Sequence, residues 1–398
     1  MSILSSVPAS ERVHIAFFGN RNAGKSSLVN AVTGQDLSVV SDVAGTTTDP
    51  VTKSMELLPL GPVLIIDTPG YDDVGSLGEL RVARTKKVIR KTDIAVICID
   101  STVGITESDS EMLELIKKRS LPYIVALTKH DLTDGAKNAY EIENAIEVSA
   151  KSGYNIHELK EKIAALAREG EIEKRPLADL CDEGDVIVLV TPIDESAPKG
   201  RLILPQQLVL RDALDRGAVA ITTQVEQLGF VLGNLKNPPK MVITDSQVFG
   251  AVSKIVPESI PLTSFSIIMA LYKGFLHTAV RAIGALDSLK DGDTVLIAEG
   301  CTHHRQCNDI GTVKIPRWLR AHVGADISIE SCSGNEFPDD LSRYAMVIHC
   351  GGCMLNEKEV LARMNRANEQ GVPFTNYGTF IAHVNGILSR SLEIFNLQ

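Results

Sequence analysis

The sequence predicts an α/β protein with mainly parallel sheets, divided into three domains. Short apolar runs of strand length alternate with amphipathic segments of helix length along the whole chain, the pattern of parallel sheets covered by helices. The 398 residues exceed what one ordinary core holds. Pro176 lies in a charged segment, and prolines recur at 256–261, so we place the domain limits there. The expected domains are 1–173, 174–260 and 261–398.

In the first domain, apolar runs predict buried parallel strands, each followed by a helical segment. These runs are VHIAFFG, VLIIDTPG, DIAVICID and YIVALTK. The segment SMELLPL-GP-VLIID reads as a hairpin, which places one antiparallel strand at an edge of the sheet. The final helix is NIHELKEKIAALAREG. This order of elements is the one expected of a small GTPase.

The second and third domains repeat the alternation of strand and helix. The second has strand-like runs at DVIVLVTP, AVAITT and KMVITDS. The third has them at DTVLIAEG, ISIESC, YAMVIHC and VPFTNYG, separated by helices such as NEKEVLARMNRANEQG. The sequence therefore predicts two further α/β sheets.

Charge and hydropathy exclude several classes of function. Fifty acidic residues against 40 basic ones give a net charge of -10, which argues against a protein that neutralises nucleic-acid phosphates. No run of apolar residues is long enough to span a membrane, and the N-terminus lacks the pattern of a secretory signal. We expect a soluble cytoplasmic protein. Its seven cysteines fit reduced thiols or metal ligands better than a disulfide framework.

The strongest chemical motif is GNRNAGKS at 19–26, which follows a predicted strand and opens a predicted helix. This is the context that a phosphate-binding P-loop requires. Gly19 and Gly24 allow the backbone amides to point at phosphate oxygens. Lys25 is expected to neutralise the β and γ phosphates, and Ser26 to offer its hydroxyl to Mg²⁺.

Further motifs follow in the order found in GTP-binding switches. Asp67 of DTPG ends a buried strand and can reach the magnesium shell, while the Gly70 amide can contact the γ-phosphate. Thr47 of AGTTTD is expected to complete the coordination of Mg²⁺ when the third phosphate is present. Asp131 of TKHD can accept two hydrogen bonds from guanine. The backbone amide of Ala150 in SAKSG is expected to contact the guanine carbonyl.

These motifs define a predicted nucleotide site. Catalysis is expected from Lys25, Asn22, Thr47 and Gly70. The residues expected to contact GTP or its ions are Asn20, Asn22, Ala23, Gly24, Lys25, Ser26, Ser27, Thr47, Asp67, Gly70, Thr128, Lys129, Asp131, Ser149, Ala150 and Lys151.

Taken together, GNRNAGKS, AGTTTD, DTPG, TKHD and SAK resemble the translation-factor-related GTPases of the tRNA-modification and ribosome-assembly type. Asn22 matches the position that helps to hold a potassium ion in potassium-activated members, where the ion can replace an arginine finger. Tyr71 stands where many GTPases carry the glutamine that orients water, so hydrolysis is expected to be slow. Thr128 stands where asparagine is usual, which puts one hydrogen bond around the base in doubt.

The last third of the chain carries a second chemistry. Cys301-Thr302-His303 is followed after 45 residues by His349-Cys350-Gly351-Gly352-Cys353. Both clusters follow predicted strands, and the carboxyl ends of parallel strands meet at one edge of a sheet. Three thiolates can hold a 4Fe-4S cluster, and the same set with one histidine makes a zinc site. Ligand chemistry alone leaves both metals open.

An N-terminal GTPase domain combined with this cysteine and histidine pattern resembles the [FeFe]-hydrogenase maturation GTPase family along the whole chain. The resemblance implies a central dimerisation domain and a C-terminal 4Fe-4S domain with Cys301, Cys350 and Cys353 as ligands. His303 or His349 would be the fourth ligand. It also implies a homodimer that carries a di-iron subcluster as transient cargo to apo-[FeFe]-hydrogenase. Two radical S-adenosylmethionine enzymes would act upstream.

A second reading is a ribosome- or tRNA-directed GTPase in which the cysteine and histidine residues hold structural zinc. The acidic balance and the paired C-terminal motif favour the first reading.

Overall fold

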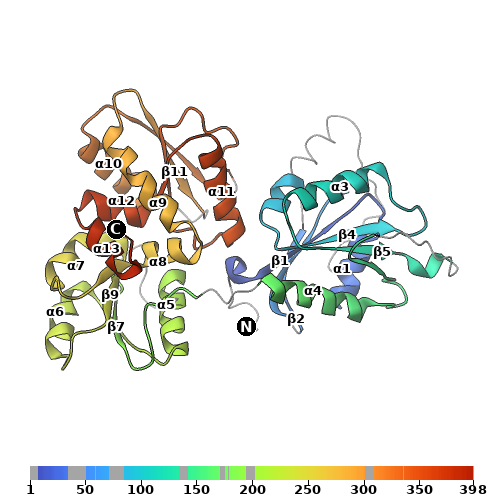
Figure 1. The fold of residues 1–398 in the computed structure, drawn as a ribbon, viewed down its shortest axis with the longest axis horizontal. Helices are drawn as coiled ribbons and strands as arrows, with labels where there is room; N and C mark the ends of the chain where they lie inside the picture. The colour runs from blue at the N-terminus through green and yellow to red at the C-terminus, as the bar shows by residue number, and fades with distance from the viewer. Residues whose placement is uncertain are drawn as a thin grey trace. The chain divides into compact units, whose positions relative to one another are not determined.

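The structure is a computed structural model that describes residues 8–34, 51–58, 60–70, 85–133, 142–170, 175–177, 179–193, 202–300, 309–334 and 336–397. Contacts divide the chain into two compact units, 1–172 and 173–398 (Figure 1). The limits of the three domains drawn from the sequence stay a prediction. The α/β class with mainly parallel sheets is confirmed.

The first unit holds a six-stranded sheet in the order β2-β3-β1-β4-β5-β6. All neighbours are parallel except β2 and β3, which pair antiparallel at one edge. The predicted hairpin and its edge position are thus confirmed. The strands are β1 Val13–Phe18, β2 Val51–Leu57, β3 Gly61–Asp67, β4 Ile94–Asp100, β5 Tyr123–Thr128 and β6 Ala145–Glu147.

Helices cover both faces of this sheet (Figure 1). Ile15 and Phe17 of β1 belong to the core under α1 (Lys25–Thr33) and α4 (Ile156–Gly170). Their neighbours in β1 belong to the core under α3 (Glu107–Lys118). Both faces of β1 are therefore buried, which explains why the strand is an apolar run rather than an alternating one. Short 3₁₀ turns lie at η2 Ala9–Glu11 and η3 His130–Leu132.

The second unit contains two four-stranded parallel sheets. One has the order β10-β9-β7-β8 and the other β12-β11-β13-β14. Six of these strands lie within predicted runs, β12 extends one residue beyond the run ISIESC, and β10 was not predicted. The strands are β7 Val186–Val190, β8 Val219–Thr223, β9 Met241–Thr244, β10 Leu262–Ser264, β11 Thr294–Glu299, β12 Ser328–Ser333, β13 Met346–His349 and β14 Phe374–Asn376.

One hydrophobic core joins these two sheets. It contains Val188 and Val242 from the first sheet and Ile297 and Val347 from the second. The helices of the unit are α5 Leu204–Asp215, α6 Val225–Asn234, α7 Phe249–Ile255, α8 Phe265–Tyr272, α9 Leu276–Ala282, α10 Ile315–Val323, α11 Glu357–Glu369, α12 Tyr377–Val384 and α13 Leu388–Leu392. Shorter turns are η4 Ser246–Val248, η5 Ile283–Ser288, the π-helical η6 Ile310–Lys314 and η7 Glu393–Phe395.

The strand order places the predicted motifs at carboxyl ends of strands, where ligands bind in parallel sheets. The P-loop follows β1, DTPG begins at the last residue of β3, and TKHD begins at the last residue of β5. In the second unit, Gly300 follows β11 and Cys350 follows β13. Among the residues that the structure describes, no helix is long and apolar enough to cross a bilayer.

Candidate nucleotide site and cysteine site

The P-loop conformation depends on two glycines. Gly19 has φ +142°, and a Cβ there would lie 2.3 Å from the backbone oxygen of Cys98. Gly24 adopts a left-handed conformation as the N-cap of α1, which side chains disfavour. Lys25 is buried, and its Nζ donates to the carbonyl oxygens of Gly19 at 3.0 Å and Asn20 at 2.6 Å. The loop thus closes around the lysine at the start of α1, where a helix attracts anions.

Ser26 and Asp67 meet as the sequence predicts. The Ser26 hydroxyl donates to Asp67 Oδ2 at 2.7 Å. The other carboxylate oxygen, Oδ1, is buried and makes no hydrogen bond within the described part of the chain. Burial raises the pKa of Asp67, opposed by the Ser26 hydrogen bond and the charge of Lys25. A hydroxyl beside an unpartnered buried carboxylate oxygen fits Mg²⁺, which prefers oxygen ligands.

The DTPG segment packs against the P-loop. A Cβ on Gly70 would lie 2.8 Å from the backbone nitrogen of Arg21, so only glycine allows this approach. Gly70 therefore lies against the P-loop; its contact with the γ-phosphate stays a prediction. Thr47 and Tyr71 lie outside the described residues.

The two asparagines of the P-loop have different surroundings. Asn22 is exposed and has φ +61°, a left-handed conformation. The Asn20 side chain instead bonds to the N-terminal turn of α3: its Nδ2 donates to Thr106 Oγ1 at 2.8 Å and to Asp109 Oδ1 at 3.1 Å, and its Oδ1 accepts from Ser108 at 2.9 Å. The predicted contact of Asn20 with GTP would thus fall to its backbone.

The predicted base-binding residues surround one pocket of about 190 Å³. Ser149 is fully buried, and its hydroxyl donates to Asp131 Oδ1 at 2.6 Å, which fixes the orientation of that carboxylate. Lys129 is held by Asp100, with 2.6 Å between Nζ and Oδ2. The pocket is lined by Gly24, Ser27, Leu28, Thr128, Lys129, Asp131, Leu132, Ala150 and Lys151.

Thr128 connects β5 to the P-loop. Its hydroxyl lies 2.7 Å from the carbonyl oxygen of Ala23 and 3.1 Å from that of Ile99. The side chain is buried. Thr128 therefore stabilises the P-loop, and this contact does not depend on an amide side chain at position 128.

The second site lies at the carboxyl ends of β11 and β13. Cys350 Sγ accepts hydrogen bonds from the backbone nitrogens of Gly300 at 3.0 Å and Gly352 at 3.3 Å. Burial raises the pKa of Cys350, opposed by these two N–H groups, and burial raises the pKa of Cys353 to about 12. Two partly buried thiols, one of them with N–H donors aimed at its sulfur, form a donor set that fits a cluster or metal bound by thiolates. Cys301 directly follows Gly300 but, like His303, lies outside the described residues.

His349 is fully buried, and both of its ring nitrogens have partners. Arg363 Nη1 lies 3.3 Å from Nε2, and Nδ1 lies 2.7 Å from the carbonyl oxygen of Cys350. Because Arg363 can only donate, Nε2 accepts and Nδ1 carries the proton. Burial and then the charge of Arg363 lower the pKa of His349 to about 3. The ring also stacks on Phe374. This geometry favours a structural role for His349 over the predicted possibility of iron ligation.

Comparison with protein families identifies the chain. Residues 177–274 match the hydrogen maturase F dimerization domain, and residues 277–394 match the hydrogen maturase F tetramerization domain. Residues 14–129 match a 50S ribosome-binding GTPase. The chain belongs to the hydrogen maturase F family. Both family-specific domains lie in the second unit, and the GTPase domain of this hydrogen maturase F chain forms most of the first.

The chain is also similar to curated GTPases. The GTPase Der of Wolinella succinogenes is 38% identical over 169 residues, covering 39% of this chain and 36% of its own length. The tRNA modification GTPase MnmE of Dechloromonas aromatica is 34% identical over 161 residues, covering 39% and 35%. The chain thus spans about a third of these relatives. The solved structure of Aquifex aeolicus Era has 23% identity and a TM-score of 0.36, with 52% of this chain and 91% of that chain covered.

Several residues of this hydrogen maturase F chain were not singled out from the sequence. Thr106 and Asp109 hold Asn20, and Arg363 fixes His349. The first pair has a readable local signal, because Thr106 and Asp109 form a capping box at the start of α3. The capping box contacts Asn20 of the P-loop, which lies more than 80 residues earlier in the chain, and no local pattern reveals such a contact.

Proposed function

We propose that this protein is a GTPase that holds a 4Fe-4S cluster and serves as scaffold and carrier in [FeFe]-hydrogenase maturation. The observation that carries the proposal is the position of Cys350, whose sulfur accepts two backbone N–H groups at the edge where Cys301 follows β11. Membership of the hydrogen maturase F family supports it.

In the GTPase domain, each motif has a defined task. The P-loop amides and Lys25 bind the phosphates and stabilise the negative charge that develops in the transition state as the bond between the β- and γ-phosphates breaks. Ser26 and Asp67 hold Mg²⁺, with Thr47 as the third protein ligand. Asp131 selects guanine over adenine by accepting two hydrogen bonds. Asn22 holds K⁺ beside the phosphates. With Tyr71 in place of a water-orienting glutamine, turnover is slow.

In the C-terminal region, Cys301, Cys350 and Cys353 are the cluster ligands. The Gly300 and Gly352 amides stabilise the thiolate of Cys350, since N–H groups aimed at sulfur favour its charged form. His303 is the preferred candidate for the fourth position, because both nitrogens of His349 have other partners. When bound, the cluster supplies an iron with an exchangeable ligand through which cargo can attach.

The cargo is the di-iron subcluster, which two radical S-adenosylmethionine enzymes build and apo-[FeFe]-hydrogenase receives. The dimerization and tetramerization domains support a homo-oligomer with at least two copies. GTP turnover then times the binding or release of partners. The ribosome- or tRNA-directed alternative rests on the GTPase part alone.

The test is iron and sulfide analysis with EPR on full-length protein reconstituted without air. We expect about four iron and four sulfide per chain in the wild type and a loss of most of both in Cys350→Ala. The matched control is Cys332→Ala, because Cys332 is a core cysteine at the end of the neighbouring strand β12. Tightly bound zinc with no uptake of iron would reject the cluster and favour the alternative.

Delivery is tested separately. Wild-type protein loaded with the di-iron subcluster is mixed with apo-hydrogenase, and the evolution of hydrogen is measured. We expect activation by the wild type and by Cys332→Ala, and none by Cys350→Ala. Activation by the Cys350→Ala protein, loaded to the same di-iron content, would show that the 4Fe-4S site is not needed for delivery.

A further inference from the structure

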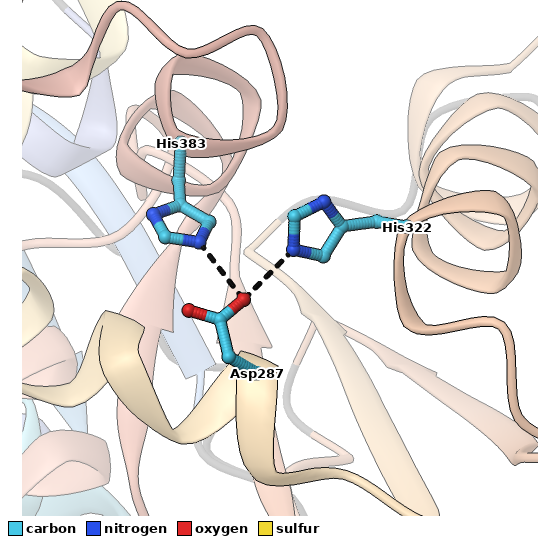
Figure 2. Close-up of side chains that lie close together, drawn as sticks. All are labelled: Asp287, His322 and His383. Carbon is cyan, nitrogen blue, oxygen red and sulfur yellow. Dashed lines mark hydrogen bonds and ion pairs between the residues drawn. The ribbon is translucent and has the colours of Figure 1, made fainter.

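Three side chains from three separate elements meet at the surface of the second unit. Asp287 comes from η5, His322 from α10 and His383 from α12 (Figure 2). His322 Nε2 lies 2.9 Å from Asp287 Oδ1, and His383 Nε2 lies 3.2 Å from the same oxygen. One nitrogen or oxygen of each residue lies within 4.8 Å of the other two. The cluster offers two imidazoles and one carboxylate.

The spacing suits a small metal ion. Bonds of 2.0–2.2 Å in a tetrahedral zinc site place neighbouring ligand atoms roughly 3.3 Å apart. The two distances from Asp287 Oδ1, 2.9 and 3.2 Å, are close to that edge length. The two imidazole rings cross at 66° with centroids 5.3 Å apart, so both can turn a nitrogen towards one point.

The electrostatic setting also favours a cation. His322 and His383 lie in the last turns of α10 and α12, and the carbonyl ends of helices carry partial negative charge. Neutral imidazoles and an ionised carboxylate are the forms that bind metals. Two histidines and one carboxylate suit zinc and other divalent transition metals.

We infer that Asp287, His322 and His383 bind one divalent transition-metal ion, with the remaining coordination position open to water. Asp287 is more than half exposed, and the histidines are partly exposed, so an ion can reach them from solvent. The ion would fasten η5, α10 and α12 to one another. All three residues lie within the segment that matches the tetramerization domain. The ion therefore stabilises the helices of that segment.

The experiment measures zinc binding by full-length protein treated with a chelator and kept under nitrogen. The wild type is compared with Asp287→Asn combined with His322→Ala and His383→Ala, by calorimetry and by metal analysis after desalting. Because the cysteine residues are the same in both proteins, any zinc they bind cancels. We expect the combined variant to bind one zinc ion fewer per chain. The control is His277→Ala, which removes an exposed histidine of the same region and should bind as the wild type does.

A single substitution guards against misfolding. His383→Gln keeps a hydrogen-bond donor for Asp287 but removes the imidazole ligand. We expect its unfolding temperature without metal to match the wild type, and its zinc affinity at this site to fall more than about tenfold. Zinc should raise the unfolding temperature of the wild type more than that of the variant. Equal zinc content in the wild type and the combined variant would overturn the inference and leave a surface hydrogen-bonded cluster.

Discussion

Asp67 illustrates how a single residue can trade stability for function. Its carboxylate is largely buried, with one oxygen that has no hydrogen-bond partner within the described chain, and burial raises its pKa. The charged form is therefore disfavoured in the folded protein unless a cation is bound. Asp100 behaves in the opposite way: although burial raises its pKa, hydrogen bonds from Lys129 and Thr102 lower it overall.

We predict that Asp67→Asn raises the free energy of unfolding of the protein when nucleotide and Mg²⁺ are absent. The same variant should slow Mg²⁺-dependent GTP hydrolysis at least about a hundredfold, since metal stabilisation of charge is worth several kcal/mol. A raised folded pKa penalises folding once the carboxyl ionises. The advantage of the variant should therefore shrink as the pH falls through the raised pKa towards 3.8. Urea unfolding between pH 4 and 7, roughly, measures this difference. Asp100→Asn is the control and should destabilise, most clearly at the higher pH.

Asn22 gives a second prediction at the residue scale. Hydrolysis should be faster in KCl than in NaCl of equal ionic strength by more than about tenfold, because a positive charge beside the phosphates acts on the transition state. Asn22→Ala should lose this difference and keep its affinity for GDP within a few-fold. Asn144→Ala is the matched control, since Asn144 is exposed with the same φ of 61°. Equal rates in KCl and NaCl for the wild type would rule out potassium activation.

At the scale of elements, the P-loop is fastened to the start of α3. Asn20 makes three side-chain hydrogen bonds with Thr106, Ser108 and Asp109, and Asp109 is buried. Removal of the amide would break these three hydrogen bonds, one of them to a carboxylate, at a cost of about 1–3 kcal/mol. The P-loop and α3 should thus behave as one rigid element.

We predict that Asn20→Ala lowers the free energy of unfolding by about 1–3 kcal/mol and speeds the release of a fluorescent GDP analogue. Ser110→Ala is the control: within the described residues its hydroxyl bonds to the Thr106 carbonyl oxygen alone, at an exposed position of the same helix, so its effect should stay below about 0.5 kcal/mol. If the Asn20→Ala protein is destabilised but releases GDP at the wild-type rate, the prediction is wrong: the contact stabilises α3 without affecting how the P-loop holds the nucleotide.

Strands that form long apolar runs could be predicted from the sequence. The strands β1, β4, β5, β11 and β13 are continuous apolar runs and were found where expected. The strand β10, Leu262–Ser264, has only three residues and lies in no longer apolar run, whereas the equally short β14 lies within the predicted run VPFTNYG. Contacts between distant residues were predicted only where both partners belong to a known motif, as Ser26 and Asp67 do. Thr128 was interpreted through a missing amide, whereas its hydroxyl binds the P-loop carbonyl of Ala23, 105 residues earlier in the chain.

The same limit applies to the cysteine site. The sequence pattern brought Cys350 and Cys353 to attention, because thiols at this spacing are typical of metal sites. It could not distinguish His349 as a ligand from His349 as a buried neighbour. That distinction depends on Arg363, which α11 places against the ring. Asp287, His322 and His383 carried no local motif, and only the packing of three elements brings them together.

At the scale of the whole molecule, the two sheets of the second unit should unfold together. In the sequence, Phe275 lies between the last strand of the first sheet and the first strand of the second. It is fully buried, and its ring makes edge contacts with His349 and Phe374 of the second sheet. It belongs to the core that also contains Val242 of β9 in the first sheet. The dimerization and tetramerization segments therefore share this core, while Ile187 and Ile243 of the first sheet belong to a second core on its other face.

We predict that Phe275→Ala lowers the free energy of unfolding of residues 173–398 by about 3–5 kcal/mol, because it removes buried contacts and leaves a cavity. Hydrogen exchange followed by mass spectrometry should show faster exchange in β9 and β13 alike, since one core unfolds as one unit. Phe17→Ala is the matched control: Phe17 is equally buried, in β1 of the GTPase unit, and its loss should speed exchange first in β1 and its neighbours. Faster exchange in β13 with β9 unchanged would show that the central and C-terminal sheets are separate folding units, in which case binding at the cysteine site could not be transmitted to the dimerization segment through their packing.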